Sequence, residues 1–145
     1  ANHPPVYGVA FNRAQGFFRR IGDDPADETR PGLLMMRAEG RLNFANAANA
    51  QEKMQALTAA TTPAPRVIVL DCSAIPDIEY TALLMLIDGE RKQRERGVSL
   101  WLAGLNPGFE QALDRSPLGA VIGPGRRFHT LQQALEAFER AEPTP

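Results

Sequence analysis

Residues 67–83 read VIVLDCSAIPDIEYTAL and carry most of the information on the fold. Residues 67–70 are four branched aliphatic side chains between turn signals, which is typical of a strand buried on both faces of a sheet. Residues 71–77 are polar and contain a proline, so they predict a loop. Residues 80–96 predict a helix that begins apolar and buried, becomes charged, and stops at Gly97.

The residues before this segment predict a hairpin and a helix. Residues 33–37 form a short apolar run, Glu39 and Gly40 suit a tight turn, and residues 41–44 continue as the second arm of the hairpin. Asn46 is expected to cap a helix with an apolar stripe, which ends at the proline-containing residues 61–65.

The residues after this segment continue the alternation of strand and helix. Residues 98–103 predict a strand, and Asn106 followed by proline starts a short helix. Residues 116–125 predict a glycine- and proline-rich loop, and a short strand is expected near Phe128. Thr130, with a glutamine three residues later, predicts a capping box for a final helix with the buried stripe Leu131, Ala134, Leu135 and Phe138.

This order of elements predicts an α/β fold, with a central mixed β-sheet of about four to six strands packed by about four α-helices. We expect the domain to cover residues 33–141. Residues 1–32 are punctuated by proline and glycine and predict an N-terminal arm and an acidic loop, with an edge strand near residues 7–11. Residues 142–145 are expected to be a tail.

Composition excludes several classes of protein. The chain has 145 residues, 43% hydrophobic and 23% charged, as expected for one folded domain. Sixteen basic and 17 acidic residues give a net charge of -1, which argues against a nucleic-acid partner. The longest apolar run, residues 82–87, is far below the ~20 residues of a membrane span, so no direct membrane insertion is expected. The single cysteine, Cys72, excludes an internal disulfide.

The polar loop and the helix start after it are the candidate site. Backbone N–H groups at a helix N-terminus favour an anion or a phosphorylated side chain. Asp71 and Ser73 are expected to close the loop through hydrogen bonds to its backbone. Asp77 is expected to cap the helix, and Glu79 lies where the helix dipole favours a negative charge.

The residue pattern offers little support for a catalytic site or a metal site. Asp71 could be a phosphoacceptor at a strand end, but it lacks the additional acidic pair that holds a metal, which favours loop closure. Cys72 follows an apolar strand and is expected to be buried and inert. His129 lacks a catalytic partner, and two isolated histidines argue against a zinc site. Residues 123–127 lack the Gly-Lys-Ser/Thr ending of a phosphate loop and predict a turn. We therefore predict no enzyme, no catalytic residue and no metal.

The candidate site resembles the signature of the STAS family, the domains shared by sulfate transporters and anti-sigma factor antagonists. Its pattern is an aliphatic strand, Asp-x-Ser, a hydrophobic position, and an acidic residue followed by Ser/Thr and a small residue. These positions fall on Asp71, Ser73, Ile75, Glu79, Thr81 and Ala82. Other segments are similar to the SulP anion-transporter branch of the family, namely residues 40–47, 97–105 and 128–134 and, in the arm, 5–7 and 28–33.

The resemblance implies a function outside catalysis. Antagonists carry a phosphorylated serine where this chain has Tyr80, with Thr81 next, so these two residues are the regulatory, phosphoacceptor-like candidates. The tyrosine favours the transporter branch: a cytosolic regulatory and interaction domain of a sulfate or related anion transporter. Its expected partners are the membrane domain of the parent protein and a cytosolic protein, and its place is the cytoplasmic side of the membrane.

Two further expectations follow from the resemblance. Nucleotide or partner contacts would fall on residues 71–77 (the signature loop) and on the helix start after them, at Asp71, Ser73, Asp77 and Glu79. The alternative function is a freestanding signalling protein of the anti-sigma factor antagonist type, controlled by phosphorylation.

Overall fold

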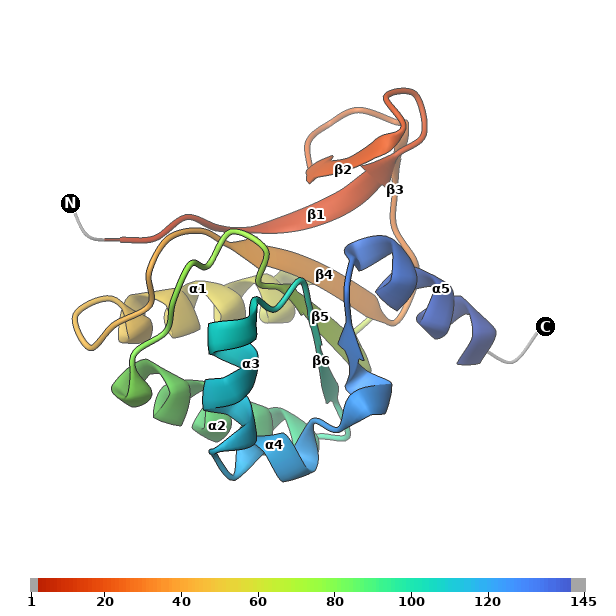
Figure 1. Cartoon of the computed structure of the whole chain (residues 1–145). Coiled ribbons are helices and arrows are strands. Elements are labelled where there is room, and N and C mark those ends of the chain that lie inside the picture. Colours follow the sequence, from red (N-terminus) through yellow and green to blue (C-terminus); the bar gives the residue numbers. More distant parts are fainter. Residues whose placement is uncertain (1–2, 142–145) are drawn as a thin grey trace.

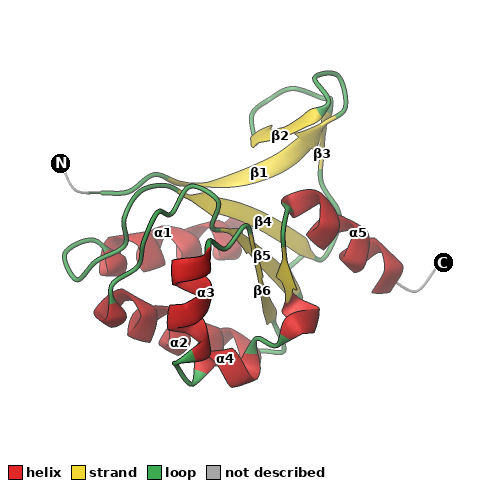
Figure 2. Cartoon of the chain, in the orientation of Figure 1, coloured by secondary structure: helices red, strands yellow, loops and turns green. Residues whose placement is uncertain are grey.

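The computed structural model describes residues 3–141, whose strands form one sheet with helices on both faces (Figures 1 and 2). Its seven strands in this range run in the order β2-β1-β4-β5-β6-β7, with β3 also paired to β1. The strands are β1 (Val6–Asn12), β2 (Phe17–Arg20), β3 (Asp27–Glu28), β4 (Leu33–Ala38), β5 (Val67–Asp71), β6 (Ser99–Ala103) and β7 (Arg127–Phe128). The predicted α/β fold with a mixed sheet is confirmed.

The centre of the sheet is parallel and buried on both faces. Strand β5 lies between β4 and β6, with Val67 in register with Leu33 on one side and Ser99 on the other. Because successive side chains of a strand point to opposite faces, this register divides the apolar residues into two cores. One contains Met36, Ile68, Leu70, Leu100 and Leu102, and the other contains Leu33, Met35, Val67, Val69 and Ala103.

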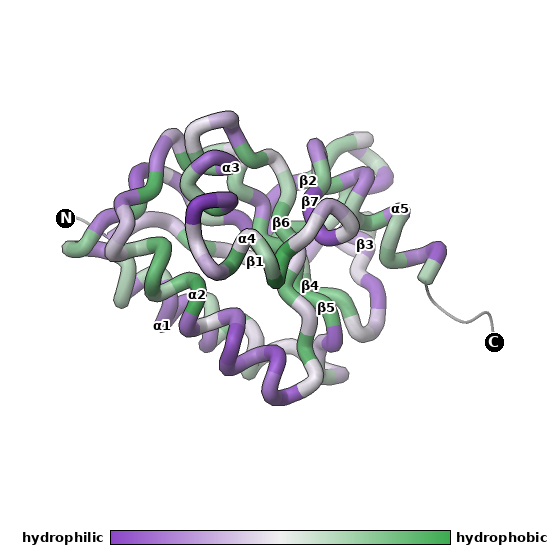
Figure 3. The backbone as a smooth tube through the Cα atoms, turned by 60° about the horizontal axis from the view of Figure 1, so that its bottom comes forward, coloured by the Kyte–Doolittle hydropathy of each residue, from purple (hydrophilic) through white to green (hydrophobic). Residues whose placement is uncertain are grey.

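The helices cover the two faces unequally. Helices α1 (Ala47–Ala60), α2 (Tyr80–Glu95), α3 (Pro107–Asp114) and α4 (Leu118–Val121) lie on one face, and α5 (Leu131–Ala141) lies on the other (Figure 1). Thr130 caps α5, since its hydroxyl accepts from the Gln133 amide at 3.2 Å, and the Gln133 side chain accepts from the His129 amide at 3.0 Å, one residue before the cap. The α2 tube changes from hydrophobic to hydrophilic along its length, as the sequence predicted (Figure 3).

The loop predicted over residues 116–125 is wrong in part, because it contains α4 and the start of a short 3-10 helix (Pro124–Arg126). Leu118 and Ile122 are almost wholly buried in the larger of the two cores, the one that contains Met36 and Leu70. The burial of these two apolar side chains holds the segment in a regular conformation despite its glycines and prolines.

The strand predicted near residues 7–11 is present as β1, but its predicted place in an arm at the edge of the sheet is wrong. Strand β1 lies inside the sheet, antiparallel to both β2 and β4, and the predicted acidic loop contains β3. Val9 and Ala10 are 2% and 0% exposed. The free edge of β4 thus pairs with β1, which removes unpaired backbone groups from the sheet.

A buried asparagine at the end of β1 is bonded to β3 and to the turns before and after β2. The Asn12 side chain is fully buried and donates to Asp24 at 3.0 Å and to Asp27 at 2.8 Å. Its oxygen accepts from the Gln15 amide at 2.9 Å. Each polar atom of this side chain is therefore satisfied, as a buried amide requires.

Acid is expected to destabilise this part of the fold. Backbone hydrogen bonds, from Gly22 to Asp27 and from Ala26 to Asp24, together with the Asn12 amide, hold the pKa of both aspartates below the usual 3.8. Because the folded-state pKa is the lower one, their stabilisation is complete above pH 3.8 and is lost as the pH falls through the folded-state values. Urea unfolding at decreasing pH measures this loss, and the pH dependence should flatten in an Asp24→Asn, Asp27→Asn variant. An unchanged slope in that variant would contradict the assignment.

The second arm of the predicted hairpin does not form. Gly40, with φ +91°, turns the chain away from β4, and its amide donates to the Ala74 carbonyl at 2.9 Å. Leu42 then forms a parallel bridge with Ile78 in the loop before α2. The left-handed conformation, which glycine adopts without steric cost, therefore sends residues 41–44 across the signature loop.

Candidate functional site

The signature loop begins with a buried ion pair at the end of β5. The Asp71 carboxylate is almost wholly buried and accepts from the Arg37 guanidinium at 2.6 Å, across the register of β4 and β5. It also accepts from the Ser73 amide and hydroxyl, both at 3.1 Å. Asp71 therefore closes the loop, as predicted, and its negative charge is compensated.

The ion pair continues into a second pair of polar side chains, near the start of β1 and just after the end of β4. The Tyr7 hydroxyl donates to the Glu39 carboxylate. Burial, and then the Glu39 contact, raise the pKa of Tyr7 above its usual value. Burial disfavours the charged form of Arg37, but the interactions with Asp71 and Tyr7 outweigh it and raise the Arg37 pKa. At neutral pH the tyrosine is thus neutral and the arginine charged.

Gly104 lets the chain after β6 pass close to the signature loop. Its φ is +71°, and a Cβ atom at this position would lie 2.9 Å from the Ser73 Cβ and 3.0 Å from the Asp71 Oδ1. A glycine here meets both requirements, since it adopts the left-handed conformation and adds no side chain. The space around the Asp71 carboxylate is therefore filled by protein.

Asp77 does not cap α2, so this prediction is wrong. The N-cap residue is Glu79, and its side chain makes no capping hydrogen bond. Asp77 instead lies 3.5 Å from the exposed Arg41 guanidinium, and Glu79 accepts from the Phe44 amide at 3.3 Å. Both acidic side chains are engaged by residues 41–44, which cross the loop because the predicted hairpin does not form.

The start of α2 presents apolar side chains to solvent. Tyr80 is 66% exposed, and Leu84, one turn later on the same helix face, is 43% exposed. Phe44 is 79% exposed, and its amide donates to the carboxylate of Glu79, the residue before Tyr80. We refer to Phe44, Tyr80 and Leu84 as the exposed patch. Thr81 is also exposed, next to Tyr80.

The predicted site residues therefore divide into two groups. Asp71 is buried and is hydrogen-bonded to the exposed Ser73, whereas Asp77, Glu79, Tyr80 and Thr81 lie on the surface without a bond to Asp71. Arg37 is not among the residues predicted from the sequence, although it is the one charged residue in β4 and stands in register with Asp71. Phe44 is not among them either, because the hairpin prediction assigned it to a strand.

Other reactive groups do not form a site. Cys72 is buried, and burial raises the pKa of its thiol well above the usual value, so the thiolate is strongly disfavoured. Residues 3–141 contain no group of three histidine, cysteine or acidic side chains able to hold a metal ion. Of the helices in this range, none combines the length and the hydropathy that crossing a membrane requires.

Comparison with known families gives one match over most of the chain. The family model described as the STAS domain matches residues 24–134. A probable sulfate transporter of Mycobacterium tuberculosis is 30% identical over 140 residues, which are 95% of this chain and 25% of the relative. Sulfate transporter 1.3 of Arabidopsis thaliana is 24% identical over 128 residues, covering 83% of this chain and 20% of the relative. The chain thus spans a fifth to a quarter of the length of these relatives.

Solved structures share the fold at low sequence identity. The murine anion transporter Slc26a9 matches with a TM-score of 0.82 and 14% identity, over 96% of this chain and 22% of that chain. The STAS domain of a SulP transporter from Vibrio cholerae has a TM-score of 0.66 at 19% identity, covering 79% and 86%. An anti-sigma factor antagonist from Mycobacterium paratuberculosis has a TM-score of 0.64 at 16% identity, covering 93% and 95%.

Proposed function

The chain belongs to the STAS domain family, and we propose that it is the non-catalytic regulatory and interaction domain of a SulP-type transporter of sulfate or a related anion. Transport itself would take place in a membrane domain of the same parent protein. The STAS domain would lie on the cytoplasmic side and contact that membrane domain, and a cytosolic protein would be a second partner.

The observation that carries this proposal is the extent of the similarity to the mycobacterial probable sulfate transporter. The match includes 95% of this chain but a quarter of the relative, as expected for one domain of a longer transporter. A match over 95% of this chain is longer than residues 33–141, so it reaches into the N-terminal segment that contains β1, the strand paired with β4. Sheet and N-terminal segment would then act as one unit in the parent protein.

The exposed patch supports an interaction role. Exposed apolar patches with a polar rim mark contact sites, and the exposed polar residues Asp77, Glu79 and Thr81 lie within three positions of Tyr80 in the sequence. Tyrosine and phenylalanine are common at the centre of protein interfaces, where they bury large areas. We propose that the parent's membrane domain docks on this patch. Nucleotide contact at the signature loop stays a prediction.

The alternative is a freestanding signalling protein controlled by phosphorylation. It is favoured by the antagonist structure, of which this chain covers 95%. The exposed Tyr80 and Thr81 would then be the acceptors. Tyr80 stands where the antagonists carry serine, which supports the transporter domain instead.

Fractionation of the native host separates the two functions. An antibody raised against this chain should detect a band several times larger than 15.9 kDa, confined to membranes, if the chain is one domain of a transporter. A soluble band near 15.9 kDa would overturn that proposal and support the freestanding regulator. Intact-mass analysis after incubation with cytosolic kinases would then test Tyr80 and Thr81 as acceptors.

Removing the exposed patch is expected to lower anion uptake by the parent protein several-fold without unfolding the domain. Phe44→Ser, Tyr80→Ala and Leu84→Ser remove side chains that contribute little to the core because they are exposed. Uptake of labelled sulfate by cells with the full-length variants measures the effect. Phe17→Ser is the matched control, since Phe17 is 55% exposed on β2. Equal losses in the control and patch variants would show that the patch has no special role.

A further inference from the structure

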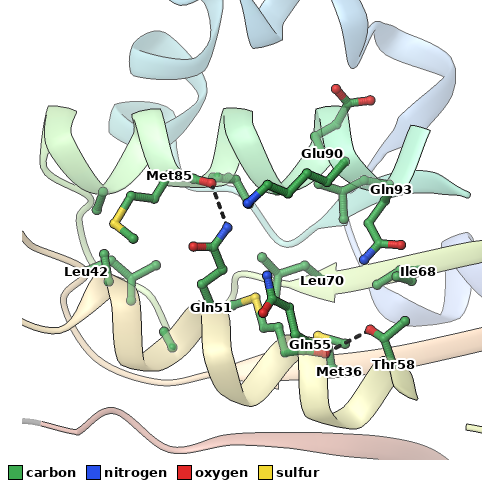
Figure 4. A pocket seen from close by; sticks show the side chains of 18 of the residues that line it. Met36, Leu42, Gln51, Gln55, Thr58, Ile68, Leu70, Met85, Glu90 and Gln93 are labelled. Carbon is green, nitrogen blue, oxygen red and sulfur yellow. Dashed lines mark hydrogen bonds between the residues drawn. The ribbon is translucent and has the colours of Figure 1, made fainter. Parts of the chain in front are cut away.

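A cavity of about 510 Å³ lies between α1 and α2, on the face of the sheet that carries the larger core. This volume is within the ~300–1,000 Å³ of small-molecule sites. Its floor is apolar and is formed by Met36, Leu42, Ile68, Leu70 and Leu100 (Figure 4). It extends from Ala47 near the start of α1 to Ala59 near its end, which is ~18 Å at 1.5 Å per residue. The cavity is therefore long and apolar.

Carboxamides line the walls of this cavity. Gln51 and Gln55 project from α1 and Gln93 from α2, toward the space between the two helices (Figure 4). Gln51 donates to the Met85 carbonyl at 3.4 Å. Within residues 3–141 the side chains of Gln55 and Gln93 have no hydrogen-bond partner. These two amides are available to a polar group of a ligand.

The charge at one end of the cavity is positive. Lys92 and Arg96 line it, close to the C-terminal end of α2. Lys92 pairs with Asp88 at 3.1 Å, but the Arg96 guanidinium makes no ion pair or hydrogen bond with the described residues. Glu90, the acidic residue of the lining, directs its carboxylate away from α1 and pairs with Arg94 at 3.1 Å (Figure 4). An anionic group is therefore favoured at this end.

Gly89 keeps the middle of the cavity open. Glycine inside a helix costs about 1 kcal/mol relative to alanine, so its place in α2 has a local cost. A Cβ atom at this position would lie 3.2 Å from the Gln51 Nε2, directed at the opposite wall. The missing side chain thus contributes to the space between the helices.

We infer that this cavity binds a long-chain carboxylate, with its apolar chain along the floor and its carboxylate at Arg96 and Lys92. This function is separate from partner docking, although Leu42 and Ala82, next to the exposed patch in sequence, line the cavity. A bound chain would hold α1 and α2 together and so fix the helix start that carries Tyr80.

Titration with dodecanoate tests the inference. Calorimetry should show saturable binding of one molecule per chain, at least tenfold tighter than dodecanol. Arg96→Ala should weaken dodecanoate binding about tenfold and leave dodecanol unchanged. Arg91→Ala is the matched control, because Arg91 pairs with Asp88 and Glu95 outside the cavity lining, and it should bind like the unmodified chain.

Filling the cavity gives the opposing test. Gly89→Leu should abolish binding, since the new side chain would occupy the space while the flexible Gln51 amide moves aside. In the unmodified chain, backbone amide shifts caused by dodecanoate should be confined to α1, α2 and the strands of the floor. The inference is overturned if no saturable binding occurs, if Gly89→Leu binds as well, or if the shifts lie on α5 or β2.

Discussion

Replacing Asp71 with alanine is expected to lower the free energy of unfolding by about 2–4 kcal/mol. The change leaves the Arg37 guanidinium without its anionic partner and removes the acceptor for the Ser73 amide. Loss of one partner of a buried ion pair typically costs 3–5 kcal/mol. Arg37 keeps 23% of its side chain exposed, so solvent offsets part of the loss. Urea unfolding followed by circular dichroism measures it.

Asp77→Ala is the matched control for this prediction. It makes the same chemical change in the same loop, but the Asp77 and Arg41 side chains are 54% and 74% exposed, and such pairs contribute at most about 1 kcal/mol. Removing both charges of the buried pair, with Arg37→Met and Asp71→Leu together, should restore part of the stability lost in Asp71→Ala. Equal costs for Asp71→Ala and Asp77→Ala would show that the buried pair does not stabilise the fold.

Replacing Gly104 with alanine is expected to cost a similar amount, about 2–4 kcal/mol. Part of the cost arises because a residue with a side chain is sterically strained at the φ of +71° that Gly104 adopts. The rest comes from the new methyl group, which would lie 3.0 Å from the Ser73 backbone nitrogen as well as close to the Asp71 carboxylate. Thermal and urea unfolding measure the change.

Gly97→Ala separates the two contributions. Gly97 has a φ of +78°, but a Cβ atom there would meet nothing within 4 Å. This variant should therefore lose only the conformational part, about 1 kcal/mol. If Gly104→Ala is no more destabilising than Gly97→Ala, the close approach between the β6 end and the signature loop is not a packing constraint.

The central elements could be predicted from the sequence because their patterns are local. Four aliphatic residues at 67–70 require burial on both faces, and the stripe on residues 131–138 has a helical period. Such patterns depend only on residues that lie within a few positions of one another in the sequence. The resemblance of the loop after residue 70 to a known signature then placed Asp71 and Ser73 in one loop.

The failed predictions concern contacts between distant segments. Residues 7–11 resemble an edge strand, and only the pairing of β1 with β4 shows that the strand is internal. The turn at Gly40 fits a hairpin equally well, and the bond from its amide to Ala74 decides against it. Arg37 lies 34 positions from Asp71, so their ion pair follows only from the register of β4 and β5.

The unequal covering of the sheet determines where the chain can be shortened. Among the described residues, α5 is the helix that covers the second core, with Leu131, Leu135 and Phe138 against β4, β5 and β6. The Arg66 guanidinium lies over the Phe138 ring, 5.3 Å from its centre. A protease that removes α5 would leave an apolar sheet face open to other molecules, and the remaining chain would be expected to aggregate. Expression of the domain in soluble form therefore requires an end point beyond Phe138.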